Sequence, residues 1–117
     1  MPLYLVAGGR PRYTNAMKIS TQLAYSGDHQ AVAQQAVEYE NAGLDMIWVA
    51  EAYSFDAVSL MGYLAAKTER ITIASGILPI YTRTPALMAQ TAAGLDAVSN
   101  GRFALGIGAS GPQVIEG

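Results

Sequence analysis

The sequence predicts an α/β fold that forms the first half of a (β/α)8 barrel, also called a TIM barrel. Short apolar segments that suit strands begin near positions 18, 45, 71 and 103, at spacings of 27, 26 and 32 residues. They are continuously apolar rather than alternating, which is typical of parallel strands that are buried on both faces. Helix-like segments separate them, and this strict alternation indicates the α/β class. Because a whole barrel needs about 250 residues, we expect residues 17–117 to be a truncated fragment that holds the first four strands.

The first strand and helix are predicted between residues 18 and 42. Residues 18–23 suit a strand, and Asp28 is a candidate N-cap. The helix that follows carries apolar residues at helical spacing, and Gly43 stands where helices often end in a left-handed residue. Residues 1–16 contain a Gly-Gly-Arg-Pro-Arg cluster of chain breakers, so we interpret them as a leader or extension outside the fold.

The second strand and helix follow the same plan. Residues 46–49 suit a strand, and Ser54 or Asp56 can cap the next helix. That helix carries apolar residues at helical spacing, and it leads to a third predicted strand at residues 71–74.

The last predicted helix has the clearest start in the sequence. Thr84 is an N-cap followed by proline at the first helical position, and the helix is expected to stop at Asn100-Gly101. Residues 103–108 form the fourth predicted strand, and no helix is expected directly after it.

Composition excludes several classes of function. Apolar residues make up 51% of the chain and charged residues 14%, so a core can be buried and a disordered tail is excluded. The net charge is −2 with no basic run, which argues against nucleic-acid binding. There is no cysteine and a single histidine, His29, so we expect no disulfide, no Cys nucleophile and no metal site. No apolar run is long enough for a membrane span or a secretory signal, and the expected location is the cytoplasm.

Glu51, which follows the second predicted strand, is the candidate catalytic residue. Side chains at positions 47, 49 and 51 share one face of an extended strand. We expect Ile47 and Val49 to point into the barrel and Glu51 to stand at its carboxyl-terminal mouth, where barrel active sites lie. A partly exposed carboxylate there should matter more for turnover than for stability. The alternative is a solvated carboxylate at the start of a loop.

Residues 106–111 (GIGASG) match the pattern G-x-G-x-x-G after a strand. A dinucleotide-binding fingerprint is one interpretation, but the pattern follows the fourth predicted strand rather than the first. The alternative is a loop whose glycines let a flat ligand approach the backbone, with Ser110 as a hydrogen-bonding group.

Three other side chains receive structural interpretations. Arg83 is expected to be solvated, with an anion near the next helix as the alternative. His29 is expected to be exposed at the start of the first helix. Trp48 is expected on the outward face of its strand, packed against helices rather than against a cofactor.

Three blocks of sequence resemble the luciferase-like monooxygenase superfamily. They are residues 47–53 (IWVAEAY), 76–85 (GILPIYTRTP) and 101–112 (GRFALGIGASGP). They look most like the branch that uses coenzyme F420, an 8-hydroxy-5-deazaflavin, which includes methylenetetrahydromethanopterin reductase.

The resemblance implies a TIM barrel that holds a deazaflavin or a flavin at its carboxyl-terminal mouth. Glu51 matches an acidic group beside the ring. Gly76 and Ile77 match a backbone bulge behind the ring, where the resemblance implies a cis peptide bond. Gly108, Ala109 and Ser110 match a loop near the ring or its tail.

Two positions depart from the pattern of some deazaflavin dehydrogenases. Ala52 stands where those enzymes carry an acid–base histidine, and Gly111 stands where some carry a glutamate. The resemblance therefore favours a reductase without dedicated acid–base chemistry over a sugar-phosphate dehydrogenase.

The expected function is hydride transfer between coenzyme F420 and an organic small molecule. One alternative is an FMN-dependent monooxygenase of the same superfamily. Another is an inactive truncated half-barrel that associates with itself. For the active protein the expected partners are a small-molecule substrate and a second copy in a homodimer, without nucleic acid or membrane.

Overall fold

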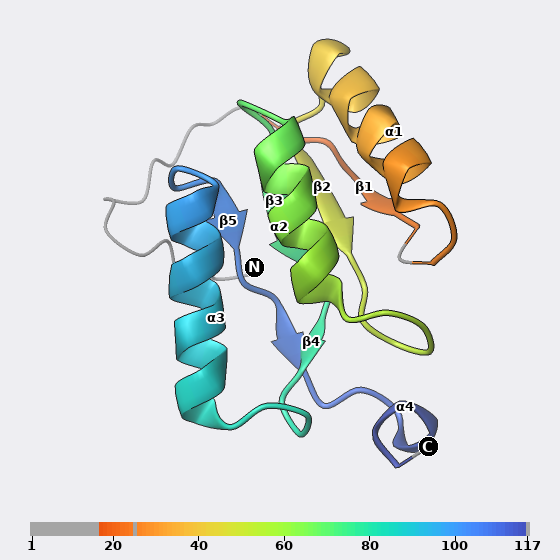
Figure 1. Cartoon of the computed structure of the whole chain (residues 1–117), viewed down its shortest axis with the longest axis vertical. Coiled ribbons are helices and arrows are strands. Elements are labelled where there is room, and N and C mark those ends of the chain that lie inside the picture. The colour runs from red at the N-terminus through yellow and green to blue at the C-terminus, as the bar shows by residue number, and fades with distance from the viewer. Residues whose placement is uncertain (1–16, 25, 117) are drawn as a thin grey trace.

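The fold alternates strands and helices along the chain, as the sequence predicts. We describe a computed structural model in residues 17–24 and 26–116 (Figure 1). The elements in chain order are β1 (Ser20–Leu23), α1 (His29–Asn41), β2 (Met46–Val49), α2 (Ala57–Lys67), β3 (Thr72–Ser75), β4 (Leu78–Pro79), α3 (Pro85–Val98), β5 (Phe103–Ala104), β6 (Ile107–Gly108) and α4 (Pro112–Ile115). The predicted leader, residues 1–16, lies outside the described residues.

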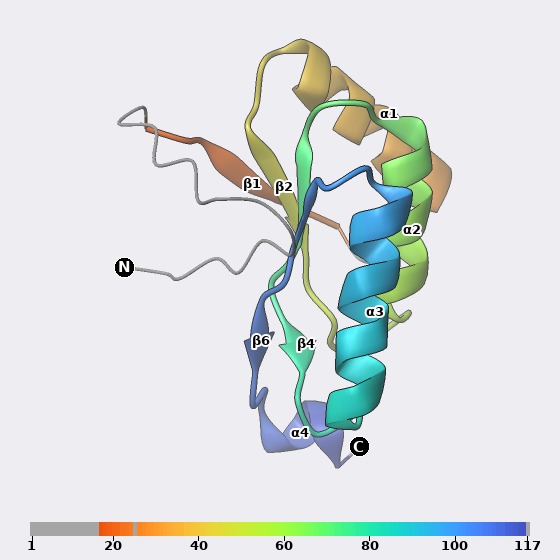
Figure 2. The same cartoon turned by 90° about the vertical axis from the view of Figure 1, so that its left-hand side faces the viewer.

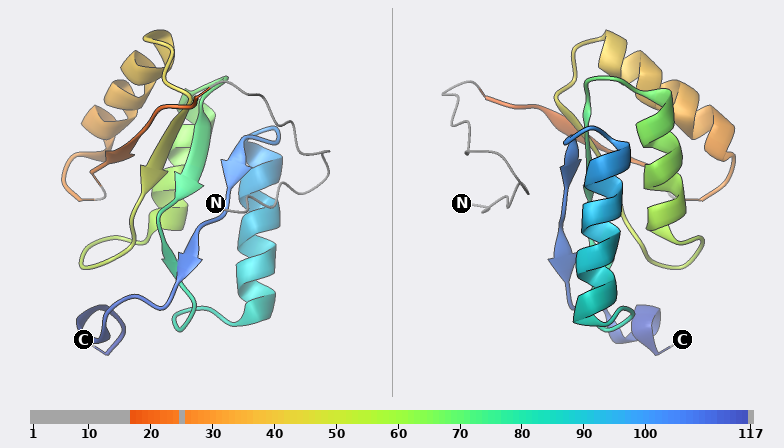
Figure 3. Two further views of the ribbon diagram at one scale, coloured as in Figure 1. Left: turned by 180° about the vertical axis from the view of Figure 1, so that it is seen from behind. Right: turned by 60° about the vertical axis from the view of Figure 1, so that its left-hand side comes forward.

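The main sheet is parallel and is covered by helices on one side. Its strand order is β1-β2-β3-β5, and β4 and β6 form a separate parallel pair. Figure 2 shows α1, α2 and α3 on the same side of the sheet, and both views in Figure 3 agree. We call the opposite side the inner face, because it is the side that a closed barrel turns toward its axis. One-sided helical cover is what the predicted half-barrel requires.

Side-chain caps begin the three long helices at the predicted positions. Asp28 accepts hydrogen bonds from the backbone of Gln30 and Ala31 at 2.9 and 3.2 Å. Of the two candidates for α2, Asp56 is the cap, and its carboxylate accepts from the Ser59 N–H at 2.8 Å. Thr84 caps α3 in the same way, with proline at the first helical position. The local sequence therefore fixes where these helices start.

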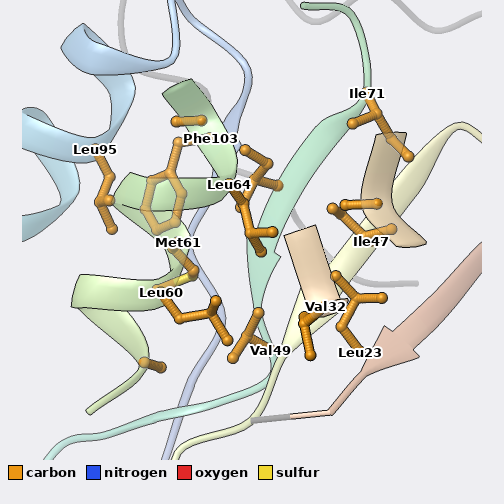
Figure 4. Packing of buried hydrophobic residues seen from close by; sticks show 14 of the residues in the cluster. Leu23, Val32, Ile47, Val49, Leu60, Met61, Leu64, Ile71, Leu95 and Phe103 are labelled. Carbon is orange, nitrogen blue, oxygen red and sulfur yellow. The ribbon is translucent and has the colours of Figure 1, made fainter. Parts of the chain in front are cut away.

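The hydrophobic core lies between the helices and the sheet (Figure 4). Ile47 and Val49 are fully buried there, with Val32 of α1 and Leu60 of α2 in the same cluster. The prediction that Ile47 and Val49 point into the barrel is therefore wrong. Since side chains alternate along a strand, Trp48 lies on the inner face, and its predicted packing against helices is wrong as well.

The fourth predicted strand is interrupted. β5 ends at Ala104 and β6 begins at Ile107, and β6 pairs with β4 instead of extending the main sheet. At the break, the Gly106 N–H donates to Ser75 Oγ at 2.8 Å, and that hydroxyl donates to the Gly106 carbonyl at 2.9 Å. A side chain thus takes the place of the backbone ladder at this point.

A short helix, α4, follows the fourth predicted strand, contrary to the expectation that none does. It begins at Pro112, after Gly111 at the N-cap position. Proline has a preset φ angle and lacks an N–H that the first turn would leave unpaired, so it suits this start.

Glu40 ties the carboxyl end of α1 to the turn before β3. Its carboxylate accepts from the backbone N–H groups of Glu69, Arg70 and Ile71 at distances of 2.6 to 3.2 Å. Burial is the largest single effect and raises the pKa of Glu40, but these three donors and the charge of Arg70 together lower it, so the pKa lies below its ordinary value of 4.5.

This pKa gives Glu40 a pH-dependent role in stability. A lowered pKa in the folded state contributes stability above the unfolded-state pKa, and that contribution is lost as the pH falls through the folded-state pKa. We expect Glu40→Gln to cost about 1–3 kcal/mol of unfolding free energy near pH 7. Urea denaturation should show the difference between the two proteins shrinking as the pH falls below the ordinary pKa of 4.5. A difference that stays constant with pH would contradict this role.

Neither a membrane span nor a metal cluster is found in the described part of the chain. No described helix is both long and apolar enough to cross a membrane. The described residues also contain no group of three or more potential metal-ligating side chains.

Candidate functional site

The predicted site residues lie at the carboxyl ends of the strands. Glu51 follows β2, Gly76 and Ile77 lie between β3 and β4, and Gly108 to Ser110 follow or end β6. The backbone links the first two groups, since the Glu51 N–H donates to the Ile77 carbonyl at 3.3 Å. Gly108 joins them, because a Cβ atom there would lie 2.5 Å from Ile77 Cδ1. Ala109 is exposed and Ser110 is half-buried beyond this cluster.

Glu51 is bound on several sides. Its Oε1 accepts from Arg83 Nη1 at 2.6 Å, and its Oε2 accepts from Arg83 Nη2 at 2.9 Å. Oε2 also accepts from the N–H of Ala57, the first residue of α2, at 2.8 Å. The two side chains are only 13% and 12% exposed. The expectation of a solvated Arg83 is therefore wrong, as is the alternative of a solvated Glu51.

The ion pair with Glu51 keeps the Arg83 side chain charged at this end of the sheet. The hydrogen bond to Glu51 raises the pKa of Arg83, and it outweighs the opposite effect of burial. A bidentate arginine–carboxylate pair also has a preferred planar geometry. Glu51 therefore connects the end of β2, the start of α2 and the segment before α3, and its catalytic role stays a prediction.

Gly76 and Ile77 carry the backbone away from the main sheet. The peptide bond between them is cis, as the resemblance implies. The Gly76 N–H donates to the Val49 carbonyl at 2.8 Å, and the Leu78 N–H donates to the Gly106 carbonyl at 2.9 Å. The segment is thus hydrogen-bonded to β2 on one side and to the break between β5 and β6 on the other.

Trp48 is a residue near this site that sequence reasoning placed elsewhere. A Cβ atom at position 76 would lie 2.5 Å from Trp48 Cε3, so the indole needs glycine there. Both faces of β2 are apolar in sequence, and apolar periodicity alone could not show which face the helices cover. The contact of Trp48 with Gly76 shows which face the indole lies on, and this contact joins positions 28 residues apart in the sequence.

The glycines of the G-x-G-x-x-G pattern make close contacts within the chain. A Cβ atom at Gly106 would lie 2.1 Å from the Ser75 carbonyl oxygen, and one at Gly108 would approach the Ile77 side chain. Ser110 adopts a φ of +63°, a left-handed conformation uncommon for serine. Internal packing is therefore a sufficient reason for the first two glycines of the pattern, and nothing in the structure favours a dinucleotide fingerprint.

Aromatic side chains extend from two loops at the same end of the sheet. Tyr53 and Phe55 precede α2, and Tyr81 precedes α3; all three are exposed. The ring of His29 contacts Phe55 edge-on, with 5.0 Å between centroids, and is half-buried. The expectation of an exposed His29 is thus wrong, because Phe55 covers part of the ring.

Comparisons with known proteins agree with this architecture. The family model of luciferase-like monooxygenases matches residues 13–117. A Mycobacterium tuberculosis protein, provisionally assigned as a coenzyme F420-dependent oxidoreductase, is 38% identical over 103 residues, which are 86% of this chain and 30% of that protein.

Solved structures match the fold at lower sequence identity. The coenzyme F420-dependent tetrahydromethanopterin reductase of Methanopyrus kandleri superposes with a TM-score of 0.79 at 24% identity, over 85% of this chain and 29% of that one. The oxygenating constituent of 3,6-diketocamphane monooxygenase from Pseudomonas putida, in complex with FMN, gives 0.72 at 23% identity, over 82% and 30%. These two matches establish the fold, and the α/β barrel class predicted from the sequence is confirmed.

The matches cover most of this chain but only part of each relative. It spans about 30% of the length of the relative from Mycobacterium tuberculosis and a similar share of both solved structures. Within that share, the family model covers nearly all of the chain. The chain therefore belongs to the luciferase-like monooxygenase family.

Proposed function

We propose that this chain is the N-terminal part of an oxidoreductase that transfers a hydride between coenzyme F420 and an organic small molecule. The observation that carries the proposal is the 38% identity to the coenzyme F420-dependent oxidoreductase assigned in Mycobacterium tuberculosis. We take residues 17–117 as the first half of the barrel and as the part that supplies one wall of the cofactor site.

The carboxyl end of the inner face suits a flat ring. Two half-buried apolar side chains, Trp48 and Ile77, lie there beside Gly76. A mainly apolar lining of this kind fits the ring of a deazaflavin or a flavin. When bound, coenzyme F420 supplies a ring carbon that accepts or gives up the hydride.

In this proposal the described residues shape and hold the cofactor site, and they do not exchange protons with the substrate. Arg83 and the Ala57 N–H hold both oxygens of Glu51, and this keeps the loop after β2 in place. The Gly76–Ile77 segment forms the edge of the inner face at the carboxyl ends of the strands. With Glu51 occupied, this part of the chain fits a reaction in which the cofactor carries the chemistry and the protein supplies orientation.

The second candidate function is an FMN-dependent monooxygenase, which the match to an FMN-bound structure favours. Equilibrium dialysis of the chain against each cofactor, read by absorbance, separates the two. We expect more retention of coenzyme F420 than of FMN. Retention of FMN alone would contradict the first function and support the second.

We expect the chain alone to bind coenzyme F420 more weakly than about 1 μM, because phosphate sites of βα barrels commonly lie after strands 7 and 8. The dialysis is therefore run at high protein concentration. A dissociation constant of about 1 μM or lower would contradict this expectation. Light scattering on the same samples tests for a self-associating half-barrel, since β1 and β5 are edge strands of the main sheet.

A further inference from the structure

The side of α2 and α3 that points away from the sheet carries an uncharged, largely apolar surface, which we call the outer helix face. Figure 1 looks onto this side, and the two helices contact each other there. On α3 the exposed residues recur every three or four positions and so form one continuous surface. They include Leu87, Gln90, Ala93, Gly94 and Val98. Leu87 is 48% exposed and Val98 is 61% exposed, whereas Asp96, the single charged residue of α3, is half-buried.

The outer helix face also lies on the outside of a complete barrel. The helices of a (β/α)8 barrel form a ring around the strands. Further βα units continue the sheet from its edge strands, β1 and β5, and their helices lie beside α1 and α3 in the same layer. They do not cover the side of α2 and α3 that points away from the sheet. The exposure of this face therefore does not depend on how much of a barrel the chain spans.

Two glycines inside these helices have no packing reason within the described part of the chain. Gly62 lies in the middle of α2, one turn from the exposed residues Ser59 and Ala66, and Gly94 lies within α3. A Cβ atom at either glycine would meet no atom within 4 Å, and neither glycine has a positive φ. Glycine inside a helix is less stable than alanine. Close approach of a helix from outside the chain is a reason that both positions share.

We propose that the outer helix face binds the same face of a second copy of the chain, with the helices of the two copies packed closely at Gly62 and Gly94. An uncharged face meets its own copy without like-charge repulsion, and it offers no charge that would select a charged partner. Helices of 11 and 14 residues are about 16 and 21 Å long and pack roughly 8–10 Å apart. A face of that size is at the lower end of specific interfaces, so we expect a dissociation constant in the micromolar range.

Sedimentation equilibrium of the chain and its variants measures this dissociation constant. Gly62→Ala and Gly94→Ala should each weaken self-association about fivefold, because the added methyl group holds the second copy away. Both variants should nevertheless raise the urea midpoint of the monomer, measured well below the dissociation constant, since alanine favours the helix and has room within the chain. Ala93→Glu should weaken association at least about tenfold, because a symmetric pair brings two carboxylates into one interface.

Two control variants lie away from the outer helix face. Gln34→Ala changes an exposed residue of α1, and Gln22→Lys places a charge on the edge strand β1. Both should leave the dissociation constant within about twofold of the wild type. Association that Gln22→Lys weakens and the helix variants do not would show pairing through sheet edges and would overturn the proposal.

Two further results would also overturn it. One is a wild type that stays monomeric up to about 1 mM, and the other is a pair of glycine variants that associate as the wild type does. If Ala93→Glu does not fold, the glycine variants decide, because both are expected to be more stable as monomers. None of these results depends on coenzyme F420, so the proposed function is tested separately by the dialysis.

Discussion

Replacing Arg102 with methionine is expected to lower the free energy of unfolding by about 3–5 kcal/mol. Its guanidinium donates to the carbonyls of Ala65, Thr68 and Ile71 and to Thr68 Oγ1, and its Nε donates to the Ser99 carbonyl, at 2.7 to 3.0 Å. Methionine fills similar volume but leaves these acceptors without their donor. Urea denaturation monitored by circular dichroism measures the loss.

The site of Arg102 explains the size of this effect. Its contacts join the carboxyl end of α2, the turn before β3 and the end of α3. Lysine keeps the charge but has a single nitrogen, so Arg102→Lys should lose most of the same stability.

Arg70 provides the matched control. Its side chain is 64% exposed, and its only described ion pair is a 4.0 Å contact with Glu69. Arg70→Met is therefore expected to change stability by no more than about 0.5 kcal/mol. Similar losses in both variants would show that the hydrogen bonds of Arg102 contribute no more than a surface charge does.

Local sequence signals were sufficient for most of the fold. Asp28, Asp56 and Thr84 cap helices because their side chains reach backbone N–H groups two or three residues ahead. Gly43 ends α1 with a φ of +87°, a conformation that favours glycine. Each of these contacts lies within a few residues, so the one-dimensional pattern contains it.

The facing of β2 could not be obtained from the same pattern. In a strand that is apolar on both sides, apolar and polar residues do not alternate, and the sequence pattern allows either set of side chains to face the helices. The helix side is decided by α1 and α2, which pack onto Ile47 and Val49. The placement of Trp48 follows from that packing, and sequence reasoning therefore assigned it to the wrong side.

The polar contacts of the candidate site and of Arg102 both join distant positions. Glu51 and Arg83 of the site are 32 residues apart, and the bonds from Arg102 to Ile71, Thr68 and Ala65, outside the site, join residues 31 to 37 apart. No periodicity relates such positions. The interruption of the fourth predicted strand has the same origin, because the Ser75 hydroxyl that bonds Gly106 belongs to another strand.

Removing either partner of the Glu51–Arg83 pair is expected to cost about 2–4 kcal/mol of unfolding free energy, because the remaining charge is left poorly solvated. This replaces the expectation that Glu51 matters little for stability. We propose a double-mutant cycle with Glu51→Gln, Arg83→Met and the double variant. Urea denaturation of the four proteins gives the interaction energy as the departure from additivity.

The expected interaction energy is about 1–3 kcal/mol, since the two side chains share two short hydrogen bonds and are almost enclosed. Asp56 supplies a control for the helix start alone. Asp56→Asn keeps a side chain that can cap α2, so it should lower stability by less than about 1 kcal/mol and show no coupling to Arg83→Met beyond that of a nearby charge. An interaction energy near zero between Glu51 and Arg83 would mean that water solvates each charge as well as its partner does. In that case the ion pair would not stabilise the fold, and this prediction would be wrong.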